Sequence, residues 1–167
     1  DSMVPLGQID PQVISKIKET IKEVTSGLEE YEFKKAIDSV MTLADYGNIY
    51  FQSHEPWKLV KADKEKAGSV LCSCLQIVKA LIILMDPIMP SKMQAAWGQL
   101  GLEGNVEAEQ FEEAIVPVPP GHKLGKPDIL FGRMEDKTTK QLEDIFKDRM
   151  SQAASKDQKE KTKKMQS

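Results

Sequence analysis

The sequence predicts an all-α protein, a helical bundle of about five helices with a proline-rich extended arm packed on it. Apolar residues recur three and four positions apart in several long stretches, which is the spacing of one helix face. Prolines and glycines stand between these stretches, where helices begin and end. The chain has 167 residues, of which 40% are hydrophobic, so it is long enough for one domain with a core.

The first helix is expected to begin at Asp10 and Pro11, because Asp caps free amide groups and Pro suits the first helical position. We expect it to break near Gly27. Its apolar stripe consists of Ile14, Ile17, Ile21, Val24 and Leu28.

A second helix is expected to begin near Glu29 and Glu30 and to end before Pro56, which disfavours helical geometry at the preceding residue. Gly47 inside this helix costs about 1 kcal/mol relative to Ala, so we expect another backbone to pack closely against it. The face predicted to point inward contains Phe33, Ile37, Val40, Ala44, Gly47 and Phe51.

The most apolar stretch, residues 63–86, is predicted to be the central helix. Pro87 and Pro90 end it, and Ser91 is expected to cap a short helix that Gly101 terminates. The central helix is expected to carry a broad apolar arc, formed by Val70, Leu71, Cys74, Leu75, Val78, Leu81, Ile82 and Met85. The short helix carries Met93, Ala96, Trp97 and Leu100.

The remaining chain is predicted to wrap around the bundle. Residues 115–121 are proline-rich and extended, and Leu130, Phe131 and Met134 are expected to dock this arm. A last amphipathic helix is expected to use Leu142, Ile145, Phe146 and Met150. We therefore predict a helical domain over residues 1–150 and a lysine-rich flexible tail or linker over residues 151–167.

Charge and composition limit the classes of function. The net charge of -3 and the pI of about 5.5 argue against binding of nucleic acid through a broad basic surface, so any such contact is expected to be local. Cys72 and Cys74 are two positions apart and cannot easily form a bridge, which favours a reducing compartment. No signal-peptide pattern opens the chain, and the apolar run at residues 80–85 is too short for a membrane span, so a cytoplasmic protein without membrane contact is expected. The extended segment at residues 4–7 suggests a piece of a larger protein.

Most candidate chemical sites have a simpler explanation. The two cysteines are better explained by core packing than by zinc, which needs about four ligands. His54 and His122 belong to no recognisable nucleophile motif. Residues 121–126 have the wrong glycine spacing for a phosphate loop, and a turn is expected. The acid-rich segment lacks the ligand spacing of a cation site; it contains Glu107, Glu109, Glu112 and Glu113. We predict no catalytic residue, metal site or cofactor in this chain.

The stretch at residues 47–61 offers a different kind of site. Trp57 follows Pro56 and is followed by lysines, among them Lys58 and Lys61. An aromatic ring beside cations is a plausible platform for a flat ligand such as an unstacked base. A partly buried structural Trp fits these residues equally well, and both readings stay open. Trp97, in an amphipathic helix without lysines around it, is expected to lie in the core.

Several ordered motifs carry a family resemblance. They are Asn48-x-Tyr50, Pro56-Trp57-Lys58-Leu59 with Lys61, Asp86-Pro87-Ile88-Met89-Pro90, Trp97, Leu100-Gly101-Leu102, Pro119-x-Gly121-His122-x-Leu124-Gly125-x-Pro127 and Leu130-Phe131. In order and spacing this series resembles the anticodon-binding domain of methionyl-tRNA synthetase in its archaeal and eukaryotic form. The resemblance extends from Val4 to about Met150.

The resemblance implies a role in aminoacylation through tRNA selection. In that family the domain follows a catalytic domain and recognises the CAU anticodon of methionine tRNA, with the first base, a cytosine, held against the Trp at the position of Trp57. It implies Trp57 as the residue that stacks the base. Asn48 and Tyr50 also match the family pattern, and they either touch RNA or only fix the loop. With Lys58 and Lys61, which are expected to hold nearby phosphates, these are the predicted RNA-binding residues. The expected partners are the anticodon loop and the catalytic domain, and not DNA.

The resemblance also implies what this chain lacks. The family's His-Ile-Gly-His-like and Lys-Met-Ser-Lys-Ser-like signatures are absent, so ATP is implied only for the parent enzyme. The family also uses an Asn and an Arg on a helix that precedes Asp1, so the first helix of the family domain, with part of the base-reading edge, is expected to lie outside this chain. The alternative function is a helical protein-interaction domain in which Trp57 is purely structural.

Overall fold

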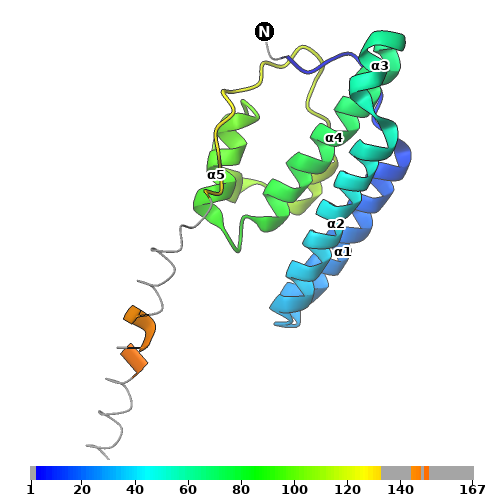
Figure 1. Cartoon of the computed structure of the whole chain (residues 1–167). Coiled ribbons are helices and arrows are strands. Elements are labelled where there is room, and N and C mark those ends of the chain that lie inside the picture. The colour runs from blue at the N-terminus through cyan, green and yellow to red at the C-terminus, as the bar shows by residue number, and fades with distance from the viewer. Residues whose placement is uncertain (1–2, 133–143, 148, 151–167) are drawn as a thin grey trace, which may run out of the picture. The chain divides into compact units, whose positions relative to one another are not determined.

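The computed structural model describes residues 3–132, 144–147 and 149–150, and it is helical, as predicted (Figure 1). Residues up to Leu130 form one compact unit, and Phe131–Ser167 form a second. The first unit contains five α-helices and two short 3-10 helices. They are α1 (Pro11–Glu29), α2 (Phe33–His54), α3 (Pro56–Ala62), α4 (Lys64–Met85), α5 (Pro90–Gln99), η1 (Val106–Ala108) and η2 (Phe111–Ile115).

Helix α1 begins where the sequence predicts and runs further than expected. The Asp10 carboxylate accepts a hydrogen bond from the amide of Gln12 (2.8 Å), and Pro11 occupies the first turn. The helix ends at Glu29, close to the predicted break near Gly27, although Gly27 itself is still helical. Gly27 instead permits a close approach of α2, since a Cβ atom there would lie 3.1 Å from the Cβ atom of Ala36.

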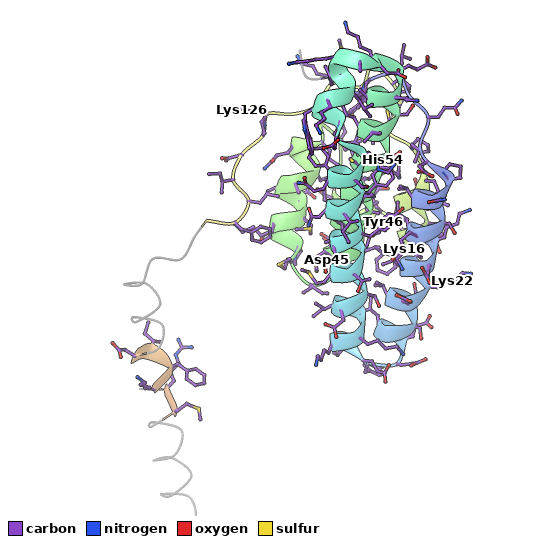
Figure 2. The ribbon with its side chains drawn as sticks, turned by 45° about the vertical axis from the view of Figure 1, so that its right-hand side comes forward. Lys16, Lys22, Asp45, Tyr46, His54 and Lys126 are labelled. Atoms are coloured by element: carbon purple, nitrogen blue, oxygen red, sulfur yellow. The ribbon has the colours of Figure 1, made fainter. Side chains whose placement is uncertain are left out.

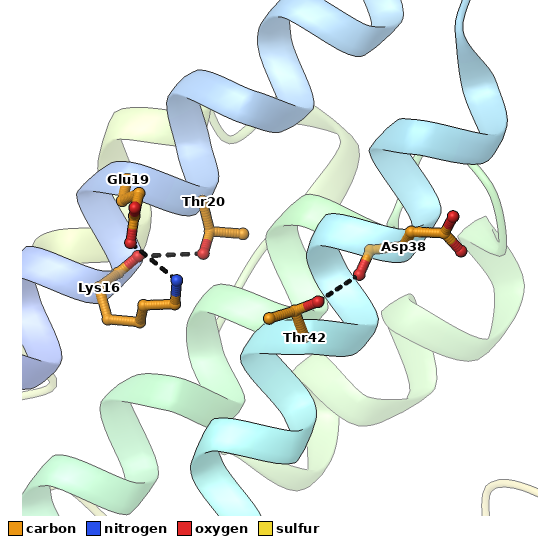
Figure 3. A network of polar contacts seen from close by, with 5 residues as sticks. All are labelled: Lys16, Glu19, Thr20, Asp38 and Thr42. Carbon is orange, nitrogen blue, oxygen red and sulfur yellow. Dashed lines mark hydrogen bonds and ion pairs between the residues drawn. The ribbon is translucent and has the colours of Figure 1, made fainter.

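One threonine in each of α1 and α2 donates its hydroxyl hydrogen to the preceding turn of its own helix. Thr20 donates to the carbonyl of Lys16 (3.0 Å), and Thr42 donates to the carbonyl of Asp38 (2.9 Å), as Figure 3 shows. Thr20 is almost fully buried, so this bond to the preceding turn removes an unsatisfied hydroxyl from the interface.

The inner face of α2 differs from the prediction by a rotation about the helix axis. Phe33 and Phe51, expected inside, are exposed, whereas Tyr50 is buried. Gly47 meets a side chain rather than a backbone, because its missing Cβ would lie 3.0 Å from Cγ2 of Ile77. The side chains of α2 that are buried are Ala36, Val40, Leu43 and Tyr50.

Helix α4 is the central element, as predicted. It contacts α1, α2, α3, α5 and both 3-10 helices. Asp63 caps its start by accepting from the amide of Lys66 (3.0 Å). The predicted apolar arc is too broad, because Leu71 and Val78 are exposed.

By length and composition alone, α4 is also apolar enough to cross a membrane, with a mean hydropathy of 2.0 over its most apolar window. The expectation from residues 80–85 therefore underestimated the apolar stretch. In the bundle 67% of this window is buried, which is how a core helix packs.

Helices α3 and α5 show where local signals were misassigned. Residues 56–62 were assigned to no helix, and they form α3. Met89, not Ser91, occupies the cap position of α5, and no side chain caps this helix. Trp97 is 3% exposed and donates to the carbonyl of Glu103 (3.1 Å), so its predicted core position is confirmed. Gly101 follows α5 with a φ of +71°, which only Gly adopts readily.

The arm that follows α5 is fastened to α4 by two side chains. Gln76 donates to the carbonyls of Ala114 and Val116, and Lys79 donates to the Val116 carbonyl at 3.0 Å. Burial lowers the pKa of Lys79, and Glu113 and Glu109 oppose this effect. Leu130 packs against the core, as predicted.

Two parts of the arm prediction fall in the second unit. Phe131 is 58% exposed, and Met134 lies outside the described residues. Residues 144–147 and 149–150 are helical, with Ile145, Phe146 and Met150 exposed. Leu142 and residues 151–167 lie outside the described part, so the tail and the domain boundary at residue 150 stay predictions.

The N-terminal strap, residues 3–10, crosses the first turns of α4. The amide of Val4 donates to the carbonyl of His122, and the amide of Gly121 donates to the carbonyl of Val4, both at 2.9 Å. The amide of Gln8 donates to Oγ of Ser69 (3.1 Å). The backbone of Leu6 lies directly against Gly68. The strap therefore joins the arm to α4.

Asp86, just after α4, is a buried carboxylate whose Oδ1 atom has no hydrogen-bond partner among the described residues. Burial, and then the charge of Glu107, raise the pKa of Asp86 above its usual 3.8. A raised folded-state pKa means that stability is highest below pH 3.8 and falls as the pH rises through the folded-state value. At neutral pH the ionised carboxylate is therefore expected to destabilise the fold.

We expect Asp86→Asn to raise the free energy of unfolding at pH 7 by about 1 kcal/mol, because Asn keeps the size of the side chain and removes the buried negative charge. The gain should shrink as the pH is lowered toward 3.8, where the wild-type carboxyl becomes protonated. Urea unfolding at several pH values measures both effects. The control is Asp45→Asn on the exposed face of α2 (Figure 2), for which no gain is expected. Equal stability of the two variants at pH 7 would contradict the prediction.

Candidate nucleic-acid interface

The predicted site lies at the junction of α2 and α3, where the chain turns at one residue. Pro56 disfavours the right-handed helical conformation at Glu55, which instead has a φ of 43° and a ψ of 55° in the left-handed region. The carbonyl of Glu55 accepts hydrogen bonds from the amides of Lys58 (2.8 Å) and Leu59 (3.2 Å). The turn therefore ends α2 and starts α3 at the same residue.

Trp57, in the first turn of α3, is 46% exposed. Its ring centroid lies 5.4 Å from that of Phe51, with the planes tilted by 55°. Phe51 is itself 38% exposed. The sequence left open whether Trp57 is a core residue or a platform. In the structure the ring of Trp57 is about half exposed and contacts Phe51, whereas Trp97 is buried.

The predicted lysines lie on the same short helix. Lys58 and Lys61 are both exposed. Nζ of Lys58 is 2.7 Å from Oε1 of Glu55, so this cation is paired across one turn. Exposed pairs of this kind contribute little to stability and exchange partners readily. Lys58 is therefore available to a phosphate that competes with Glu55.

Asn48 and Tyr50 occupy different places. Asn48 is exposed, one turn before Phe51 on the same face of α2. It borders an apolar hollow of about 300 Å³ between α2 and α4, lined also by Cys74 and Val78. Tyr50 is 7% exposed and packs in the core. The structure thus places Trp57, Lys58 and Lys61 on one surface, with Asn48 on the adjoining face of α2, and it buries Tyr50.

Sequence reasoning missed part of this surface. Phe51 was expected in the core. Glu55 was correctly expected to leave helical geometry before Pro56, but its pairing with Lys58 was not foreseen. The spacing of Asn48 and Phe51 by three positions, and a charged residue directly before Pro56, were the available signals.

The other candidate groups make internal contacts. His54 Nδ1 lies 2.8 Å from the carbonyl of Tyr50, and His122 Nε2 lies 2.9 Å from the carbonyl of Leu100. Cys72 and Cys74 are free thiols. Within the described residues no group of three or more His, Cys, Asp or Glu side chains is placed to hold a metal ion. The predicted turn is centred on Pro120 and Gly121, where the amide of His122 donates to the carbonyl of Pro119 (3.2 Å) and Gly121 has a φ of +78°. Lys123 then pairs with Met3 in an isolated antiparallel bridge.

Comparison with known proteins gives one consistent family. A family model described as the anticodon binding domain of methionyl tRNA ligase matches residues 3–151. The chain is 56% identical over 153 residues to the methionine–tRNA ligase of Methanothrix thermoacetophila, covering 92% of this chain and 23% of that protein. For the enzyme of Methanosarcina acetivorans the identity is 46%, with coverages of 92% and 22%. The chain therefore spans less than a quarter of the length of these relatives.

Solved structures agree in fold. Methionyl-tRNA synthetase of Mycobacterium tuberculosis bound by methionyl-adenylate has a TM-score of 0.71 at 21% identity, over 78% of this chain and 27% of that one. The free form of the same enzyme has a TM-score of 0.65 at 21% identity, over 80% and 28%. At this level of identity the likeness concerns the arrangement of the helices.

Proposed function

Because the chain belongs to the anticodon-binding domains of the methionyl-tRNA ligases, we propose that it recognises the CAU anticodon of a methionine tRNA as part of a longer synthetase. Aminoacylation, with its requirement for ATP, is carried out by a catalytic domain outside this chain. This domain contributes tRNA selection, binds no cofactor of its own and works in the cytoplasm.

The observation that carries this proposal is the half-exposed ring of Trp57 beside Phe51. Sequence-specific recognition of RNA targets unpaired loop bases, which can be splayed out and stacked on aromatic side chains. The first anticodon base stacks on the open part of the Trp57 ring, and Phe51 limits the movement of that ring. Such stacking contributes about 1–3 kcal/mol per base.

Local polar groups complete the proposed contact. Lys58 and Lys61 neutralise phosphates on either side of the stacked base, with Lys58 exchanging Glu55 for a phosphate oxygen. Asn48 can donate and accept a hydrogen bond at a base edge. The acidic net charge of the chain keeps binding local to this end of the bundle.

The test is a titration of the 167-residue chain with a methionine tRNA anticodon stem-loop, followed by fluorescence anisotropy. We expect the CAU loop to bind roughly tenfold or more tightly than the same stem with a changed first anticodon base, as 1–3 kcal/mol per misread base implies. Equal affinity for both loops would refute the proposal. The rival function, a protein-interaction domain with a structural Trp57, is not favoured by the family to which the chain belongs.

A further inference from the structure

The last two turns of α2, which lead into the junction with α3, contribute one buried side chain to the core, while the backbone at Gly47 packs against Ile77. Beyond Leu43, Tyr50 is the one side chain of α2 that is buried. A helix end with few buried contacts opens locally at low free energy. The position of this end therefore depends strongly on Tyr50.

Tyr50 lies where three parts of the first unit meet. Its hydroxyl donates a long hydrogen bond to Oδ2 of Asp10 (3.4 Å), while Oδ1 of the same carboxylate caps α1. The amide of Asp10 in turn donates to Oγ of Ser73 in α4 (2.9 Å). These contacts connect the end of α2 with the start of α1 and with α4.

The pKa of Tyr50 reflects the same surroundings. Burial raises it above the usual 10.0, Ser73 lowers it through a hydrogen bond, and the Asp10 carboxylate raises it. The hydroxyl is thus held in its neutral, donating form at physiological pH.

The ring of Tyr50 also supports the turn that follows. It stacks on His54 with centroids 4.1 Å apart and planes at 29°, and its own carbonyl lies 2.8 Å from Nδ1 of His54. Figure 2 shows His54 on α2, on the side of Tyr46 toward α3. Tyr50 thereby fixes His54. The next residue is Glu55, whose left-handed conformation turns the chain into α3.

Tyr50 and Phe51 face opposite surroundings although they are neighbours in the chain. Tyr50 is in the core, whereas Phe51 reaches the surface and contacts Trp57. A rotation or fraying of the last turns of α2 would therefore move both supports of Trp57, the ring of Phe51 and the junction at Glu55.

We infer that Tyr50 is a positioning residue for the Trp57 platform and that it acts without touching RNA. It sets the rotation of the last turns of α2, and through Phe51 and Glu55 it fixes the direction of the Trp57 ring. The consequence for RNA affinity rests on the proposed function, whereas the effect on the Trp57 ring does not.

The experiment labels both tryptophans with 5-fluorotryptophan and compares three forms of the full chain by ¹⁹F NMR: wild type, Tyr50→Phe and Tyr46→Phe. Tyr46 is the matched control, because it lies one turn earlier on α2 with its ring 6.2 Å from that of Tyr50. Trp97 is the internal reference, and a Trp57→Phe sample assigns the two signals. Each form is also titrated with the CAU stem-loop.

In Tyr50→Phe we expect the Trp57 signal to shift or broaden while the Trp97 signal stays in place, and we expect RNA affinity to fall about three- to tenfold, as for one lost hydrogen bond. Tyr46→Phe should leave both signals and the affinity unchanged. The inference is overturned if Tyr50→Phe leaves Trp57 unchanged, if it shifts both tryptophans alike, or if Tyr46→Phe has the same effect. If the wild type does not distinguish CAU from altered loops, the proposed function fails, and the ¹⁹F signals still decide whether Tyr50 positions Trp57.

Discussion

Trp57→Ala is expected to weaken binding of the CAU stem-loop by about 10- to 100-fold, because stacking of a base on an aromatic ring contributes roughly 1–3 kcal/mol. The ring of Trp57 is half exposed, and among the residues that the structure describes its aromatic neighbour is Phe51. Its removal should therefore change the free energy of unfolding by less than it changes the free energy of binding. Anisotropy titrations and urea unfolding of the same samples measure the two quantities.

Val60→Ala is the matched control for Trp57→Ala. Val60 is an apolar residue of the same short helix and is 47% exposed, so its truncation removes exposed surface without removing an aromatic ring. RNA affinity should be unchanged in this variant. Trp57→Phe, which keeps a smaller ring, should bind with intermediate affinity. Wild-type affinity of Trp57→Ala, or an equal loss in Val60→Ala, would exclude Trp57 as the platform.

Gly68→Ala is expected to destabilise the fold by roughly 2–4 kcal/mol, which places it among the severe single substitutions. A Cβ atom at Gly68 would overlap the backbone oxygen of Leu6, and a backbone atom cannot move aside as a flexible side chain can. The N-terminal strap would have to leave the first turns of α4. That movement also disturbs the bonds from the strap to Ser69 and to His122.

Gly98→Ala provides the opposite expectation for the same chemical change. Gly98 lies in α5, and no heavy atom would come within 4 Å of an added Cβ atom. Ala favours a helix over Gly by about 0.5–1 kcal/mol, so this variant should be more stable than the wild type. Urea unfolding of both variants gives the comparison. A stabilised Gly68→Ala would show that the strap does not pack against α4 as described.

The helix boundaries could be predicted because they depend on local signals. Each of these signals affects only residues close to it in the chain. The signals are Asp10 with Pro11, Asp63, and the prolines after α2 and α4, and the helix ends predicted from them are correct or nearly so. Two local signals were misjudged. Gly27 was interpreted as a helix breaker, whereas it allows α2 to approach α1 closely. Ser91 was interpreted as the cap of α5, whereas α5 begins earlier and Met89 occupies the cap position.

The rotation of α2 could not be predicted in the same way. Apolar and aromatic residues occur on more than one side of this helix, and consecutive residues are separated by about 100° around the axis. Only contacts with α1 and α4 decide which side faces inward. For this reason the sequence assigned Phe51 to the core and Tyr50 to RNA, whereas the structure buries Tyr50 and brings Phe51 to Trp57.

The contact between Val4 and His122 has a consequence for the order of folding. These residues lie near the first and last positions of the compact unit in the sequence, and backbone hydrogen bonds bring them together in space. Closing so long a loop costs more entropy than pairing α1 with α2, which are adjacent in the chain. The helical hairpin can therefore form early, and the closure of the strap on the arm follows once α4 is in place. In the native protein the same contact is expected to be among the first to exchange its amide hydrogens, because short extended segments at the surface open more readily than a central helix.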